Sequence, residues 1–266
     1  MELSQIKNKK LFLFDMDGTL YLGDRLYDFT QTLLDTIREC GGRYLFMTNN
    51  SSKSVKDYID KLAKLGIASE YDDFLTSSQA TAFYLSQHHK GQKLYVCGTK
   101  SLKEELSRAG LIITEDADHA QCSVMGFDTE LTFQKLEDVS RLLCTRDLPY
   151  IATNPDYVCP TEFGSVPDCG SVSDMLYNVS KKRPLFIGKP SPLMPQLAMK
   201  KWGVTPEETV VIGDRIYTDI KSGLNAATLT ILVMSGETTA EILESSEDKP
   251  HIVMQDAGEL IPLLKA

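Results

Sequence analysis

Short runs of apolar residues, each followed directly by polar or charged residues, recur along the chain and predict buried β-strands. Residues 11–14 read LFLF and are followed at once by Asp15. An apolar run with no polar position is typical of a strand that is buried on both faces of a parallel sheet. The same pattern predicts further strands within residues 43–50, 93–99, 122–128, 150–156, 185–190, 209–214 and 229–236.

Between these runs, apolar residues recur at helical spacing. Phe29, Leu33, Leu34 and Ile37 would share one face of a helix that ends at the glycine pair 41–42. Further helices are predicted at residues 55–65, 100–110, 132–144, 192–203 and 217–227. Strands that alternate with helices over short connections favour an α/β fold, with a Rossmann-like parallel sheet as its core.

Polar side chains cluster where several of the predicted strands end. In an open parallel sheet, ligands bind beyond the carboxyl ends of the strands, so adjacent strands would bring these side chains to one edge. The side chains expected at this edge are Asp15, Asp17, Thr48, Asn49, Lys189, Asp214 and Asp219.

Three carboxylates beside a lysine suit a site that binds Mg²⁺ and a phosphate group. Mg²⁺ prefers oxygen ligands, and Asp15 and Asp214 are the natural side-chain ligands. A carboxylate can also attack phosphorus and form an aspartyl-phosphate. Thr48 would hold phosphate oxygens, Lys189 would neutralise charge, and Asp17 would protonate the leaving oxygen and then activate water.

Composition limits which binding partners and which cellular compartment are expected. The chain has 266 residues, a net charge of −9 and 42% hydrophobic residues, so a nucleic acid or an anionic membrane is not expected as a partner. Its six cysteines form no CxxC pair, which favours free thiols in a reducing compartment. Residues 1–10 lack the apolar stretch of a signal peptide, and no run approaches a membrane span. We therefore expect a cytoplasmic protein.

Four motifs, DMDGT, TNN, GKP and GDRIYTD, occur in this order and resemble those of the haloacid dehalogenase superfamily of phosphatases. The resemblance extends over nearly the whole chain. It implies that Asp15 is the nucleophile and Asp17 the general acid and base. Phosphate would be bound by Thr48, Asn49 and Lys189, and the lysine would also stabilise the nucleophile.

The same resemblance implies a magnesium site. Its ligands would be the carboxylates of Asp15 and Asp214 and the main-chain carbonyl of Asp17. Asp219 would act through a metal-bound water or through hydrogen bonds to the ligands.

The spacing of the motifs predicts where a second domain is inserted. About 33 positions separate DMDGT from TNN, which is room for one βα unit, whereas roughly 140 separate TNN from GKP. We therefore expect a catalytic core of residues 1–78 and 182–266 and an inserted α/β cap of residues 79–181. The stretches TNNSSKS, ATNPD and GKPSP are similar to those of the NagD-like (p-nitrophenyl phosphatase-like) branch, whose α/β caps occupy this location.

Three further polar residues have two interpretations each. Asn154 and Asp156 would reach from the cap to the substrate, or they would only form a type I turn around Pro155. Arg215 would add positive charge near the phosphate, or it would only pair with a surface carboxylate.

The predicted function is Mg²⁺-dependent hydrolysis of a small-molecule phosphomonoester through an aspartyl-phosphate. A phosphomutase and a non-catalytic phosphometabolite-binding protein are the alternatives, and a dehalogenase is disfavoured because it needs neither a second aspartate nor a metal. Relatives in the branch act on nucleotides, phosphoglycolate, pyridoxal phosphate or sugar phosphates, and the residues do not select among these. Cap-to-cap dimers occur in the branch, so a homodimer is left open.

Overall fold

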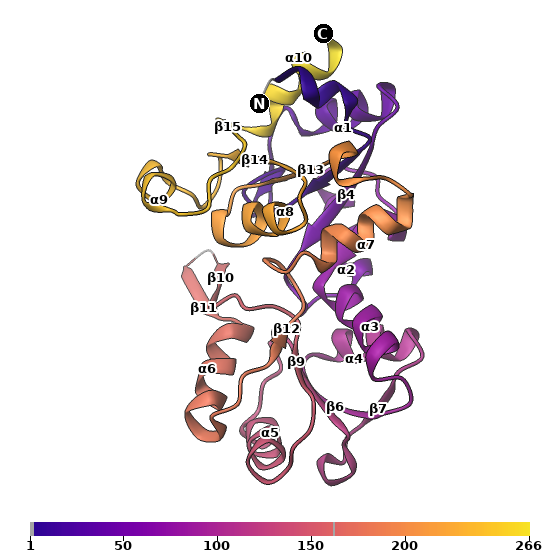
Figure 1. Cartoon of the computed structure of the whole chain (residues 1–266), viewed down its shortest axis with the longest axis vertical. Helices are drawn as coiled ribbons and strands as arrows, with labels where there is room; N and C mark the ends of the chain where they lie inside the picture. The colour runs from indigo at the N-terminus through magenta and orange to yellow at the C-terminus, as the bar shows by residue number, and fades with distance from the viewer. Residues whose placement is uncertain (1–2, 162) are drawn as a thin grey trace. The chain divides into compact units, whose positions relative to one another are not determined.

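The computed structural model describes residues 3–161 and 163–266, and the chain forms two compact units. The first unit comprises the residues up to Thr48 together with Ile59–Leu75 and Lys189–Ala266, and the second comprises Asn49–Tyr58 and Thr76–Gly188. Figure 1 labels helices and strands of both units where there is room. The division into a catalytic core and a cap inserted at residues 79–181 stays a prediction.

The first unit is built on a six-stranded sheet with the order β15-β14-β13-β1-β4-β5. Its strands are β1 (Leu11–Phe14), β4 (Arg43–Thr48), β5 (Phe74–Thr76), β13 (Thr209–Gly213), β14 (Leu229–Val233) and β15 (Ile252–Met254). The central strand β1 pairs in parallel with β13 on one side and with β4 on the other. All residues of β1, β13 and β14 are buried, which explains why their sequences are nearly free of polar residues. The predicted Rossmann-like parallel sheet is therefore confirmed.

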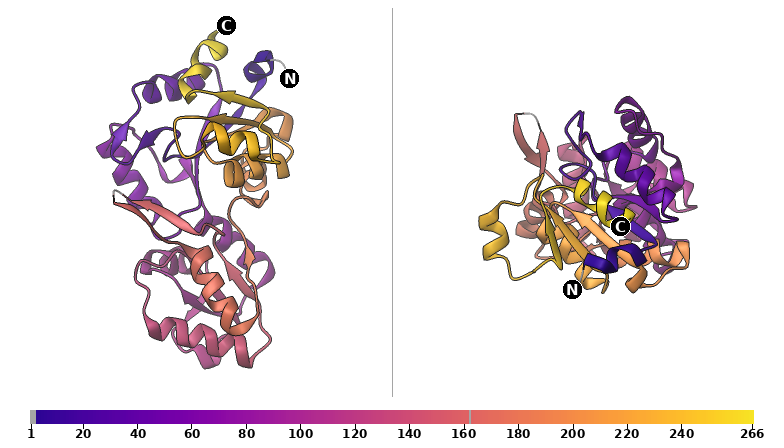
Figure 2. Two further views of the ribbon diagram at one scale, coloured as in Figure 1. Left: turned by 90° about the vertical axis from the view of Figure 1, so that its left-hand side faces the viewer. Right: turned by 90° about the horizontal axis from the view of Figure 1, so that it is seen from above.

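Helices flank this sheet. They are α1 (Thr30–Glu39), α7 (Leu193–Trp202), α8 (Lys221–Asn225), α9 (Ala240–Ser245) and α10 (Leu260–Lys265). Helix α1 buries Leu33, Leu34 and Ile37, the positions that its helical spacing predicts. Helix α10 packs against α1 and against the 3₁₀ helix Leu3–Asn8, as the two views in Figure 2 show.

The second unit contains a five-stranded sheet with the order β12-β9-β8-β6-β7. Its strands are β6 (Lys93–Cys97), β7 (Ile112–Thr114), β8 (Cys122–Met125), β9 (Tyr150–Ala152) and β12 (Leu185–Phe186), and they pair in parallel. Its helices are α3 (Ser77–His88), α4 (Lys100–Arg108), α5 (Phe133–Thr145) and α6 (Cys169–Ser180). Helix α2 (Val55–Lys64) begins in the second unit and ends in the first.

Side-chain caps define where several of these helices begin. The Thr76 hydroxyl accepts a hydrogen bond from the Gln79 N–H at 3.1 Å, and the Gln79 side chain accepts one from the Thr76 N–H at 2.9 Å. This reciprocal pair is a capping box at the start of α3. Thr99, Thr132 and Asp168 cap the first turns of α4, α5 and α6 in similar ways.

The remaining strands form two hairpins. One pairs β2 (Tyr21–Leu22) with β3 (Arg25–Leu26), and the other pairs β10 (Val158–Thr161) with β11 (Gly164–Pro167). All six cysteines are free thiols. Within the part of the chain that the structure describes, none of the helices has the length and apolar character needed to span a membrane.

Candidate active site

The ends of three neighbouring strands in the first unit provide the candidate site. Asp15 follows β1, Asp214 follows β13, and Thr48 is the last residue of β4. Because β1 lies between β13 and β4, the carboxyl ends of these strands are adjacent. The π-helix Ile216–Ile220, which follows β13, adds Asp219.

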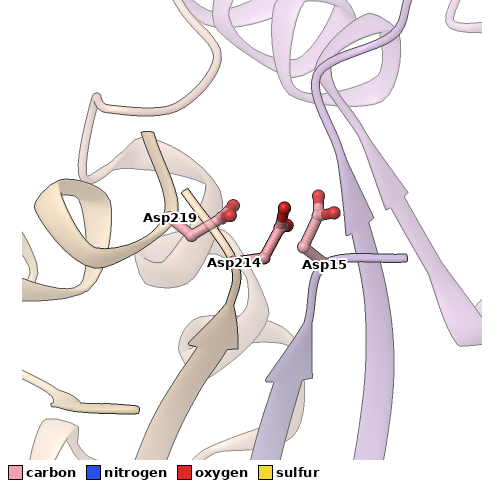
Figure 3. A group of neighbouring side chains, drawn as sticks. All are labelled: Asp15, Asp214 and Asp219. Atoms are coloured by element: carbon pink, nitrogen blue, oxygen red, sulfur yellow. The ribbon is translucent and has the colours of Figure 1, made fainter. Parts of the chain in front are cut away.

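Asp15, Asp214 and Asp219 form a compact group of carboxylates. One oxygen from each lies within 4.8 Å of the others, and Figure 3 shows Asp15 and Asp214 side by side with Asp219 extending toward them. Asp214 and Asp219 are almost completely buried. The oxygen-only donor set and the close spacing are what a hard divalent cation requires.

Glycines leave room for these carboxylates. A Cβ atom at Gly213 would lie 2.4 Å from the Asp219 carboxyl carbon, and one at Gly236 would lie 2.0 Å from an Asp214 oxygen. At Gly18, where φ is +86°, a Cβ would lie 2.5 Å from the same Asp214 oxygen. Any other residue at these three positions would displace the aspartates.

Lys189 is the buried counterion of the group. Its ammonium donates hydrogen bonds to Asp15 Oδ1 and Asp219 Oδ1, both at 2.6 Å, and to the Met47 carbonyl at 3.2 Å. Burial alone would lower the pKa of Lys189, but the Asp15 and Asp219 carboxylates raise it above its ordinary value. The lysine therefore stays charged and fixes one oxygen of Asp15.

One ammonium does not balance three carboxylates. Burial, and then the charges of Asp15 and Asp219, raise the pKa of Asp214 to about 7. Burial also raises the pKa of Asp219 to about 6, although the Lys189 ammonium opposes this shift. The excess negative charge fits a site that holds a divalent cation.

These shifts predict that the metal-free protein is more stable in mild acid. A carboxyl group whose pKa is higher in the folded than in the unfolded state binds its proton more tightly when folded, so its contribution to stability grows as the pH falls below the folded pKa. For Asp214 we expect the free energy of unfolding in EDTA to rise by about 2 kcal/mol between pH 8 and pH 5.5. Urea unfolding at the two pH values measures this.

The matched control for this measurement is Asp214→Asn, which keeps the shape of the side chain and removes the titrating group. The rise in stability between pH 8 and pH 5.5 should be about 2 kcal/mol smaller in this variant. Equal rises in both proteins would show that Asp214 does not titrate in this range.

Asp17 lies in the loop after β1, outside the carboxylate group. Its side chain is exposed, and its Oδ1 accepts a hydrogen bond from the Gly23 N–H at 3.3 Å. The surrounding protein partly removes water from the carboxyl group, and this desolvation raises the pKa of Asp17. The negative charge of Asp15 raises it further. A carboxyl group with a raised pKa and access to solvent suits proton transfer.

Arg215, which follows Asp214 directly, pairs with a carboxylate. Its Nε lies 2.8 Å from Glu237 Oε2, and its main-chain N–H donates to Asp219 Oδ2 at 3.1 Å. Of the two interpretations of Arg215, pairing with a carboxylate therefore has an observed partner, Glu237. Its contact with a substrate stays a prediction.

The remaining predicted residues divide between the two units. Thr48 is buried in the first unit, and Asn49, Asn154 and Asp156 belong to the second. Asn49 Nδ2 donates to Asp156 Oδ2 at 2.7 Å, and Asn154 Nδ2 donates to the same oxygen at 2.9 Å. The two buried amides therefore share the buried Asp156 carboxylate. The roles of these three residues toward phosphate or substrate stay predictions.

The loop after β14 also contributes to the site, although none of its residues was predicted there. The Glu237 N–H donates to Asp214 Oδ2 at 2.6 Å, and the Ser235 hydroxyl donates to the Gly18 carbonyl at 2.7 Å. The signal that could have found it is the glycine at position 236, three residues after the end of a buried strand of the same sheet. This loop holds Asp214 through its backbone, so no acidic or basic motif marks it.

Comparison with known proteins agrees with the geometry. A family model described as haloacid dehalogenase-like hydrolase matches residues 12–112, and a second, described as HAD-hydrolase-like, matches residues 186–260. The 5′-nucleotidase YutF of Bacillus subtilis is 34% identical over 97% of this chain and 100% of its own. An acid sugar phosphatase of Staphylococcus aureus is 33% identical over 98% of this chain and 100% of its own.

Among solved structures, a 4-nitrophenylphosphatase from Thermotoga maritima is similar with a TM-score of 0.93 and 38% identity. The match covers 98% of this chain and 99% of that one. This similarity confirms the resemblance to the NagD-like, p-nitrophenyl phosphatase-like branch. The chain therefore belongs to the haloacid dehalogenase-like hydrolases and is an enzyme of their phosphatase group.

Proposed function

We propose that the enzyme hydrolyses small-molecule phosphomonoesters in a Mg²⁺-dependent reaction that passes through an aspartyl-phosphate on Asp15. The observation that carries this proposal is the environment of Asp15. One of its oxygens is hydrogen-bonded to Lys189, and its carboxylate lies beside the two buried carboxylates of Asp214 and Asp219, which gives the site excess negative charge. A carboxylate held in this way is oriented for attack on phosphorus.

The three clustered carboxylates fit Mg²⁺. Asp15 and Asp214, with the main-chain carbonyl of Asp17, would hold the ion, and Asp219 would support it through hydrogen bonds. When bound, Mg²⁺ would offset the negative charge that Asp15 and the phosphate otherwise bring together.

In the proposed reaction, an Asp15 oxygen attacks phosphorus and the bond between phosphorus and the leaving oxygen breaks. Asp17 gives its proton to that oxygen, so the leaving group departs as a neutral alcohol. Asp17, now a carboxylate, takes a proton from water as the water attacks phosphorus. The phosphorus–Asp15 bond breaks, inorganic phosphate leaves, and both aspartates return to their initial states.

Lys189 and Thr48 are proposed to act on the phosphoryl group during both steps. Lys189 keeps its charge and lies beside Asp15, so it can neutralise phosphate oxygens as well as the nucleophile. Thr48, at the end of the strand next to β1, can donate a hydrogen bond to another phosphate oxygen.

The test is phosphate release from a panel of monoesters, with Mg²⁺ and with EDTA. Nucleoside 5′-monophosphates and sugar phosphates are tested first, because two relatives are named a 5′-nucleotidase and an acid sugar phosphatase. Phosphoglycolate, pyridoxal phosphate and p-nitrophenyl phosphate follow. Release that requires Mg²⁺ supports the proposal. Transfer of phosphate within a sugar, or binding without release, would instead support a phosphomutase or a binding protein.

Replacing Asp17 with asparagine should slow turnover by 10²- to 10⁴-fold, because the proton donor and acceptor is lost. The affinity for Mg²⁺ should change little, since only the main-chain carbonyl of Asp17 is a proposed ligand. Steady-state rates at several Mg²⁺ concentrations measure both quantities. Asp24→Asn, an exposed carboxylate in the turn between β2 and β3, is the control. A variant at position 17 that no longer responds to Mg²⁺ would contradict the assigned role.

A further inference from the structure

Both connections that leave the second unit at the candidate site run through a buried cluster of polar side chains. Asn49 directly follows Thr48, and Gly188 directly precedes Lys189. Thr48 and Lys189 are thus each one peptide bond away from the second unit. The side chains of the cluster, all at most 9% exposed, are Asn49, Ser51, Thr153, Asn154, Asp156 and Asp168. We call this set the junction cluster.

Asp156 lies at the centre of the cluster. Its Oδ2 accepts hydrogen bonds from Asn49 Nδ2 at 2.7 Å and from Asn154 Nδ2 at 2.9 Å. The Asn154 amide also donates to Asp168 Oδ1, at 3.1 Å. A buried carboxylate that accepts two amide hydrogen bonds fixes the orientation of both amides, because leaving any of these groups unsatisfied is costly.

Two hydroxyl groups, those of Thr153 and Ser51, join the side-chain oxygen of Asn154 to the segment that follows Thr48. Thr153 Oγ1 donates to Asn154 Oδ1 at 2.8 Å, so the Ser51 hydroxyl must be the donor in its own 2.8 Å contact with Thr153 Oγ1. The Phe127 N–H in turn donates to Ser51 Oγ at 2.9 Å. Residues 49–51 are therefore held to residues 153–156 at two points.

The second connection packs against the same atoms. The Gly188 N–H donates to the Thr153 carbonyl at 2.8 Å. A Cβ atom at Gly188 would lie 2.6 Å from Asn49 Oδ1 and 2.6 Å from the Thr153 carbonyl oxygen. The two connections thus pass each other so closely that only glycine fits at position 188.

We propose that the junction cluster positions the phosphoryl-transfer residues, by fixing the spacing between the backbone at Thr48 and the backbone at Lys189. This inference rests on the proposed function. In the first unit, Lys189 also donates to the carbonyl of Met47, the residue before Thr48, at 3.2 Å. Two sets of contacts therefore fix the separation of Thr48 and Lys189. One is the hydrogen bond of the Lys189 side chain in the first unit, and the other is the junction cluster in the second unit.

The expected effect is on the transition state, because both residues are proposed to bind the transferring phosphoryl group. A displacement of about 1 Å at a positioned group can reduce the rate by 10²-fold without changing any catalytic side chain. The residues of the junction cluster other than Asn49 would act as positioning residues, since they work through the backbone of their neighbours.

The experiment replaces Asp156 with asparagine, which keeps the size of the side chain and removes an acceptor from the centre of the cluster. We expect kcat/KM for p-nitrophenyl phosphate to fall by about 10- to 100-fold. The inhibition constant of orthovanadate, which binds as a mimic of the phosphoryl transition state, should rise by the same factor. The concentration of Mg²⁺ that gives half-maximal activity should stay unchanged.

The vanadate measurement separates positioning from loss of stability. A variant that is merely less stable contains less active enzyme, which lowers the apparent rate and leaves the inhibition constant as in the wild type. Thr153→Val, which removes the hydroxyl that joins Ser51 to Asn154, is the second variant and decides the question if Asp156→Asn does not fold. Tyr95→Phe, which removes a 2.8 Å hydrogen bond to Asp138 elsewhere in the same unit, is the control.

Wild-type vanadate inhibition in folded Asp156→Asn or Thr153→Val would overturn the inference and leave the proposed function standing. A failure of the proposed function is seen separately, as hydrolysis that survives Asp15→Asn, and the inference would fall with it. A rise in the inhibition constant in the two cluster variants but not in Tyr95→Phe would support it.

Discussion

Asp15→Asn is expected to abolish phosphate release while the protein stays folded. The substitution keeps the size of the side chain but removes the carboxylate that attacks phosphorus, and an amide oxygen is a poor nucleophile. Loss of a nucleophile costs on the order of 10⁴-fold or more in turnover in enzymes with covalent intermediates. Release of p-nitrophenol or inorganic phosphate, measured at saturating Mg²⁺, gives the factor.

The fold should tolerate this change because Asp15 is one of three clustered carboxylates. Removing its charge relieves repulsion with Asp214, and Lys189 keeps its hydrogen bond to Asp219. Thermal unfolding in EDTA should therefore show a melting temperature no lower than that of the wild type. Asp24→Asn serves as a control for a neutralised surface aspartate, and turnover within 10-fold of the wild type in Asp15→Asn would exclude Asp15 as the nucleophile.

Lys189→Met is expected to cost both activity and stability. Methionine approximates the length of the lysine stem but leaves the partly buried Asp15 and the fully buried Asp219 without their shared ammonium. Breaking a buried ion pair by removing one partner typically costs 3–5 kcal/mol. We expect a loss of about that size in the free energy of unfolding at pH 8, together with a loss of turnover.

A second substitution shows whether unpaired charge causes the loss. In Lys189→Met/Asp219→Asn one of the two stranded carboxylates is gone, so part of the stability should return while activity stays low. Asp219→Asn alone completes the cycle, and urea unfolding of the four proteins gives the coupling energy. If Lys189→Met unfolds within about 1 kcal/mol of the wild type, the lysine does not balance these carboxylates in the way proposed.

The sequence predicted the central strands well because burial on both faces leaves a simple pattern. β1, β13 and β14 contain only buried residues, and their apolar runs identify them directly. Asp15 and Asp214 were predicted at one edge of the sheet because each follows a predicted strand, and the carboxyl ends of adjacent parallel strands meet at one edge. Adjacent strand ends in the structure bring them together with Asp219.

The edges of the sheets and the later helices were harder to predict. β15 and β7 have three residues each and are only partly buried, so neither shows a continuous apolar run. Helix α6 begins at Cys169 after an aspartate cap, and its exposed apolar residues Met175 and Val179 weaken the helical pattern. Tertiary contacts, more than local sequence, define these elements.

The junction cluster was beyond prediction for a different reason. Asn154 and Asp156 flank a proline, and a local reading offers only a turn or a reach toward a ligand. Asn49, which donates a hydrogen bond to Asp156, lies more than one hundred positions earlier in the chain. A hydrogen bond between residues so far apart leaves no mark on the spacing of either segment.

The pairing of β1 has a consequence for synthesis of the chain. β1 is made before its neighbour β13, which follows about 200 residues later in the chain. At 5–20 residues per second this interval takes roughly 10 to 40 s. Until then one edge of a fully apolar strand lacks its native partner, and such edges are prone to wrong pairing. Residues 76–188 are made before β13, so the second unit has time to fold on the ribosome. During that time the sheet that carries the nucleophile still lacks the pairing of β1 with β13.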